Sequence, residues 1–117
     1  MEFFARTNNQ NLDEDSLKNQ LTIAMLPALC SSIDSVILDN KDSGRIYCVW
    51  GEFDINREEI DHGIRFTLPR CPNALAWTIT YDDDTSEITV HCTINTAEPD
   101  TDFIDTIKQF VVDWQIN

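Results

Sequence analysis

The stretch "AWTITYDDDTSEITVHCTI", residues 76–94, alternates apolar and polar residues twice around Asp82, Asp83 and Asp84. Alternation with a period of two predicts two strands, each with one face turned toward a core. Short carboxylates suit the connection between them, because they hydrogen-bond their own backbone and accept uncommon dihedral angles. The stretch therefore predicts an antiparallel hairpin with the aspartates at its tip.

Three more strands are predicted on the N-terminal side of this hairpin. They cover residues 35–39, 45–53 and 64–68, which are rich in β-branched and aromatic residues. A turn containing Gly44 separates the first two, because glycine accepts positive φ angles. Segment 54–63, "DINREEIDHG", is interpreted as a polar connection. Strand 45–53 is unusual, since apolar side chains occupy both of its faces.

A helix is predicted at each end of this set of strands. Asp13 begins the first helix, which continues with apolar residues at helical spacing until Pro27 ends or kinks it. The second lies within residues 97–115, with Asp100 or Thr101 as its cap. Its apolar stripe, which we expect to be buried against the sheet, comprises Phe103, Ile104, Ile107, Phe110, Val111 and Trp114.

The order helix, five strands, helix predicts a single α+β domain over residues 1–117. Its simplest arrangement is a five-stranded, mostly antiparallel meander, with the N-terminal and C-terminal helices forming a second layer on one face. Hydrophobic residues make up 42% of the chain, which suits a folded domain. No apolar run reaches the ~20 residues of a membrane span and no signal peptide is recognisable, so a cytoplasmic location is expected.

The sequence offers little catalytic chemistry. Its cysteines, Cys30, Cys48, Cys71 and Cys92, follow no zinc-binding pattern, and Cys48 and Cys92 are expected to be buried free thiols. Cys71 is the best candidate for an exposed thiol, because Arg70 is adjacent, but no acid–base partner can be nominated. No nucleotide-binding or hydrolase motif is present. We predict no catalytic residue, cofactor or metal ion, and keep a small enzyme with a site hidden in the sequence as an alternative.

The net charge of −13 favours a basic protein partner. Residues 1–50 carry seven acidic side chains against four basic ones, and residues 51–117 carry fourteen against four. Such a field repels nucleic acids and anionic membranes and attracts cations. A general contribution to solubility explains the same charge. Imitation of DNA is a further alternative, although the acids gather in turns and form no periodic array.

The candidate binding surface combines acidic connections with the aromatic strand. If both helices cover one face of the sheet, the last three strands show a polar face that carries Arg65, Thr67, Ala76, Thr78, Thr80, Glu87, Thr89, His91 and Thr93. Threonine also simply suits a solvated strand. An aromatic patch from strand 45–53 is expected on that face, with acids around it. The candidate partner-binding residues are Tyr47, Trp50, Asp54, Glu58, Glu59, Asp61, Asp82, Asp83 and Asp84.

These observations predict a small, non-catalytic binding protein: an adaptor, inhibitor, immunity or chaperone-type protein. In size, acidity and order of elements the chain resembles small secretion chaperones and toxin-neutralising immunity proteins. That resemblance is one of outline and transfers no residues. The doubly apolar strand 45–53 also predicts a homodimer with Trp50 or Tyr47 near its centre, unless a helix covers the second face.

Overall fold

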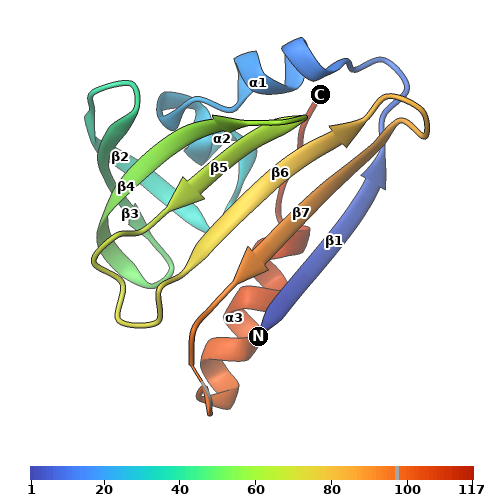
Figure 1. Ribbon diagram of the computed structural model, residues 1–117. Helices are drawn as coiled ribbons and strands as arrows, with labels where there is room; N and C mark the ends of the chain where they lie inside the picture. The colour runs from blue at the N-terminus through green and yellow to red at the C-terminus, as the bar shows by residue number, and fades with distance from the viewer. Residues whose placement is uncertain (97) are drawn as a thin grey trace.

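The computed structural model describes residues 1–96 and 98–117. Its strands are β1 (Glu2–Asn8), β2 (Ile33–Asp39), β3 (Ser43–Cys48), β4 (Gly51–Ile60), β5 (Gly63–Thr67), β6 (Ala76–Asp82) and β7 (Glu87–Thr93). Its helices are α1 (Glu14–Gln20), α2 (Leu26–Leu29) and α3 (Thr101–Val112). The α+β class is confirmed. The prediction of five strands is wrong, because the described residues form one antiparallel sheet of seven (Figure 1).

The sheet has the order β1-β7-β6-β5-β4-β3-β2, so β2 to β7 form a meander and β1 joins it beside β7. The helices lie against one face, where the apolar side chains of the strands form a continuous core. Trp77 of β6 lies at the centre of this core. Its ring stacks on Phe66 with a centroid distance of 5.4 Å, and it meets Phe110 of α3 edge-on at 5.0 Å.

The prediction of a single strand over residues 45–53 is wrong, because the chain changes direction within this segment and forms parts of two strands. Val49 and Trp50 form a two-residue turn between β3 and β4, and Cys48 pairs with Gly51 across it. Gly51 has a φ of +111°, a conformation that favours glycine. The apolar residues assigned to two faces of one strand are therefore divided between β3, the turn and β4.

Segment 54–63 is not a polar connection, because β4 continues through it to Ile60. Arg57 occupies a position on the face that the helices cover, and only 11% of its side chain is exposed. Its Nε donates to the Leu21 carbonyl at 2.6 Å and its Nη2 donates to the Lys18 carbonyl at 3.1 Å. The guanidinium thus satisfies carbonyls that the end of α1 leaves unpaired. The strand is not recognisable from the sequence, because the charged Arg57 occupies a core-facing position where an apolar residue is expected.

β1 was not among the predicted strands. Phe3 packs on the core and pairs with Cys92, whereas Phe4 stacks on His91 at a centroid distance of 4.3 Å. One aromatic side chain on each face leaves no clear alternation over a strand of seven residues.

The turn between β2 and β3 does not use a positive φ at Gly44. Lys41 adopts that conformation, with a φ of +78°. Gly44 lies in β3, where a Cβ atom would overlap the carbonyl oxygen of Leu38. Glycine is required there by close packing of two strands.

The N-terminus of α1 is confirmed, but the predicted extent of the first helix is wrong. Asp13 caps it by accepting a hydrogen bond from the Ser16 N–H at 2.7 Å. α1 ends at Gln20, and a 3₁₀ turn at Ile23–Met25 follows. Pro27 lies in the first turn of α2, where its missing N–H costs no hydrogen bond.

The C-terminal helix is confirmed with Asp100 as its cap. Ala97, the first residue of the predicted segment, lies outside the described residues. α3 ends before Trp114, yet Phe110 and Trp114 are both buried as expected. Within the described ranges, no helix is long and apolar enough to cross a membrane.

Candidate binding surface

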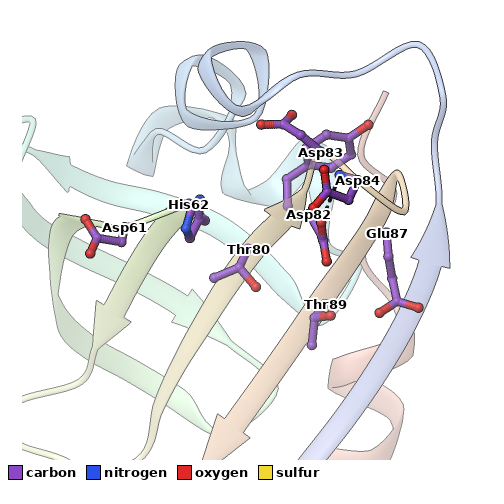
Figure 2. A pocket seen from close by; sticks show the side chains of 9 residues that line it. Asp61, His62, Thr80, Asp82, Asp83, Asp84, Glu87 and Thr89 are labelled. Carbon is purple, nitrogen blue, oxygen red and sulfur yellow. Dashed lines mark hydrogen bonds between the residues drawn. The ribbon is translucent and has the colours of Figure 1, made fainter.

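Two of the acidic connections meet at one end of the sheet. The β4–β5 turn contributes Asp61, and Asp82, Asp83 and Asp84 come from the end of β6 and the turn that follows it. With Glu87 they line a depression of about 540 Å³, shown from close by in Figure 2. The other lining residues are His62, Thr80, Tyr81 and Thr89. The topology of the sheet therefore brings together acids that are about twenty residues apart in the sequence.

Hydrogen bonds hold the β6–β7 turn in place. The Asp84 N–H donates to Asp82 Oδ1 at 2.9 Å, so a carboxylate closes the turn as expected. The Tyr81 hydroxyl donates to the Asn9 carbonyl at 2.9 Å, and the Asn9 N–H donates to the Ser86 carbonyl at 2.9 Å. These bonds attach the segment after β1 to the turn that carries the aspartates.

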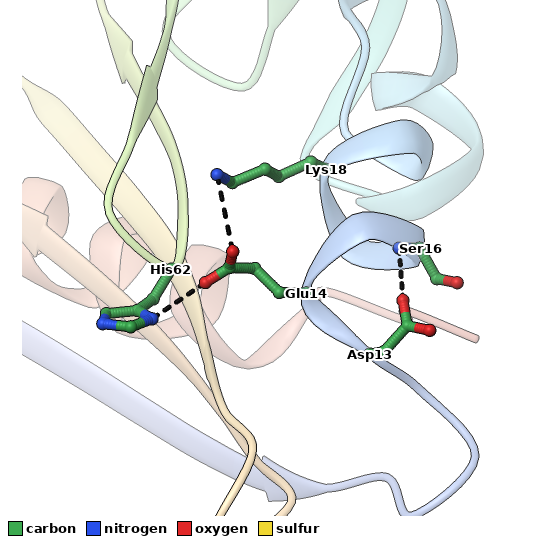
Figure 3. Close-up of polar contacts among 5 residues, drawn as sticks. All are labelled: Asp13, Glu14, Ser16, Lys18 and His62. Carbon is green, nitrogen blue, oxygen red and sulfur yellow. Dashed lines mark hydrogen bonds and ion pairs between the residues drawn. The ribbon is translucent and has the colours of Figure 1, made fainter.

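The basic side chains next to this depression are already paired. His62 Nδ1 lies 2.8 Å from Glu14 Oε1, and Lys18 Nζ lies 3.8 Å from the other oxygen of that carboxylate (Figure 3). Arg6 lies 3.7 Å from Glu87. Over residues 1–96 and 98–117, the four aspartates of the depression have no basic side chain within ion-pair distance. Uncompensated negative charge is thus concentrated at this end of the sheet.

The other acidic candidates lie away from the depression. Asp54 on β4 is held by Arg45 at 3.0 Å and by Arg70 at 3.3 Å. Glu58 and Glu59 line a second depression of about 700 Å³, to which three basic side chains also contribute. The acidic candidates therefore divide into an unpaired group at one end and a mixed, partly neutralised group elsewhere.

Tyr47 and Trp50, the aromatic candidates, lie in different environments. Tyr47 is 50% exposed on β3. The Trp50 ring packs against Phe103 and Phe110 of α3, and its Nε1 donates to Thr106 Oγ1 at 2.8 Å. Trp50 thus attaches the β3–β4 turn to α3 and is only partly exposed, so Tyr47 is the more accessible of the two.

The face opposite the helices is polar at its centre, where Thr67, Thr78, Thr80, Thr89 and Thr93 are all partly exposed. β1 adds to this face a cluster of side chains that, like the strand itself, is not predicted from the sequence. His91 stacks on Phe4, and the Arg6 guanidinium lies 5.3 Å from the centre of the Phe4 ring. Glu2 Oε1 lies 3.1 Å from His91 Nε2.

Cys30, Cys48 and Cys92 are buried free thiols. Burial raises the pKa of Cys30 and of Cys92 to about 12, and it also raises the pKa of Cys48. Such thiols stay protonated and are poor nucleophiles. Cys71 is partly exposed beside a small pocket of about 240 Å³. In the described part of the chain, no group of three or more His, Cys, Asp or Glu side chains is placed to hold a metal ion.

In comparisons with known proteins, no family model, no curated protein and no solved structure matches this chain.

Proposed function

We propose that this chain is a small, acidic, non-catalytic binding protein whose partner is a basic protein. The observation that supports this best is the depression between the β4–β5 and β6–β7 turns. Four aspartates line it without a basic side chain in ion-pair distance among the described residues. Mutual repulsion of these carboxylates is relieved when a cationic surface covers them.

The mechanism is electrostatic steering followed by docking on a prearranged surface. The net charge of −13 attracts a basic partner at long range, and the effect weakens as salt screens it. Hydrogen bonds from Tyr81 and Asn9 hold the turn in place, so little ordering is required on binding. Neighbouring threonines on β6 and β7 offer hydroxyl groups beside the acids. An adaptor, inhibitor, immunity or chaperone role would use the same surface.

The test compares two variants that lose the same amount of charge. The first carries Asp82→Asn, Asp83→Asn and Asp84→Asn, in which asparagine preserves the turn chemistry. The matched control carries Asp34→Asn, Glu98→Gln and Asp105→Asn, at exposed positions away from the depression. Each immobilised protein is incubated with lysate of the source cells at low and at high salt.

We expect the parent and the control to retain the same basic protein at low salt and to release it at high salt. The Asp82–Asp84 variant should retain much less of it. Equal retention by both variants, or retention that salt does not change, would contradict the proposal.

A further inference from the structure

The two edge strands of the sheet, β2 and β1, differ in how regularly they pair with their neighbours. The register of β2 on β3 shifts between Ile33 and Ser35 and again between Val36 and Leu38. Such irregularities interrupt the row of backbone groups that an added strand would need. β1, at the other edge, pairs with β7 in unbroken register over Glu2–Asn8 and contains no proline. Only the β1 edge is regular enough to accept another strand.

The backbone groups at this edge can be assigned from the ladder to β7. Met1 and Ile94 exchange both backbone hydrogen bonds, and the Asn9 N–H donates to the Ser86 carbonyl. In an antiparallel ladder the bonded residues alternate, so the odd-numbered residues of β1 bond to β7. The even-numbered residues therefore direct their N–H and C=O groups away from the sheet; these are Glu2, Phe4, Arg6 and Asn8.

Two side chains of opposite charge lie at equal distances in sequence on either side of Phe4 at this edge. Phe4 is 48% exposed on the face opposite the helices. Glu2 precedes it by two residues and Arg6 follows it by two, so both project from the same face of the strand. The sequence Glu-x-Phe-x-Arg is complementary to itself when read in opposite directions.

We propose that β1 is a self-association edge, to which β1 of a second copy of this chain adds in antiparallel orientation about a two-fold axis at Phe4. In this register Phe4 faces its own copy, and Glu2 faces Arg6 at both ends of the contact. All three pairs consist of residues whose backbone groups are free. An axis at Ala5 would instead place Glu2 opposite Asn8 and would bring no opposite charges together.

Charge over the whole chain also favours a second copy at this edge. β1 carries one acid and one base, whereas the chain as a whole carries −13. The acidic depression lies near the end of β1 at Asn8, which pairs with Glu87. Because the two copies of β1 run in opposite directions, their depressions lie at opposite ends of the joined sheet. The dimer therefore keeps its most negative regions apart.

The self-association site proposed here differs from the one expected from the sequence. The dimer expected from strand 45–53 rested on a strand with two apolar faces, and the turn at Val49 and Trp50 removes that premise. On the covered side, β1 adjoins a small groove of about 110 Å³ between the strand and the end of α3. Val112 in this groove is 61% exposed, and a second copy at the β1 edge would shield it.

The test is sedimentation of the full chain from low to high micromolar concentration at moderate salt. We expect a reversible monomer–dimer equilibrium. Arg6→Glu should weaken it at least about tenfold, because like charges then face each other at both ends. Combining Arg6→Glu with Glu2→Arg should restore it. The matched control is Lys41→Glu, which changes the net charge equally at the β2–β3 turn and should leave association unchanged.

Amide hydrogen exchange gives a second readout that altered folding would not reproduce. The amides of Phe4 and Arg6 should become protected as the protein concentration rises, whereas the amide of Ala5 should be protected at every concentration. A monomer at high micromolar concentration would overturn the proposal. So would a dimer that survives Arg6→Glu, or one that the double charge reversal fails to restore.

Discussion

The centre of the Trp114 ring lies 5.7 Å from the centre of the Phe110 ring and 6.2 Å from that of Trp77, although Trp114 follows the end of α3. The backbone there is held by a bridge to Cys30 and by the Gln115 N–H, which donates to the Leu29 carbonyl at 2.8 Å. The C-terminal segment thus returns beneath the sheet and closes the core.

Replacing Trp114 by alanine should lower the free energy of unfolding by about 3–5 kcal/mol, because a buried aromatic ring is lost and a cavity remains. Urea denaturation measures the change. Val49→Ala is the control, since Val49 is 53% exposed in the β3–β4 turn and its replacement should change stability by less than about 0.5 kcal/mol. A loss below about 1 kcal/mol for Trp114→Ala would mean that the ring contributes little to the core.

α1 is a short element whose attachment to the sheet depends on Arg57. This side chain is nearly buried and donates hydrogen bonds to two carbonyls at the end of the helix. Arg57→Met keeps a similar volume of hydrocarbon but leaves those carbonyls unpaired. We expect a loss of about 1.5–3 kcal/mol in the free energy of unfolding, and faster hydrogen exchange in α1.

The matched control for this element is Arg65→Met, because Arg65 is exposed on β5 on the face opposite the helices. Its replacement should change stability by less than about 0.5 kcal/mol. Equal effects of the two substitutions, or unchanged exchange in α1, would show that Arg57 does not anchor the helix.

Elements whose signals are local could be predicted from the sequence, and those that depend on distant partners could not. The hairpin of β6 and β7 and the stripe of α3 carry their periodicity within one segment. β4 could not be predicted, because the partner that makes a buried Arg57 acceptable, the Leu21 carbonyl, lies 36 residues earlier in the chain. β1 was missed for the same reason, since the contact of Phe4 with His91 exists only through pairing with β7. The acidic depression likewise requires two turns that only the folded sheet places together.

At the scale of the whole molecule, negative charge is unevenly distributed. Four aspartates collect at one end of the sheet, Asp54 is held between Arg45 and Arg70, and the β1 edge is balanced. A partner of opposite charge and a second copy of the chain would therefore use different places. The two proposals can fail independently, because variants at Asp82–Asp84 leave the β1 edge intact.

The stability of the core should depend on pH in the alkaline range, because buried thiols lie in three parts of it: after α2, in β3 and in β7. Burial raises the pKa of Cys92 from 9.0 to about 12. Between these values the unfolded chain releases a proton that the native chain keeps, so stability present below pH 9 is lost as the pH rises. Each thiol should contribute a slope of up to about 1.4 kcal/mol per pH unit. Urea denaturation from neutral to alkaline pH should show a smaller slope for Cys92→Ala than for the parent. Identical slopes would mean that this thiol ionises as readily in the folded protein as in the unfolded chain.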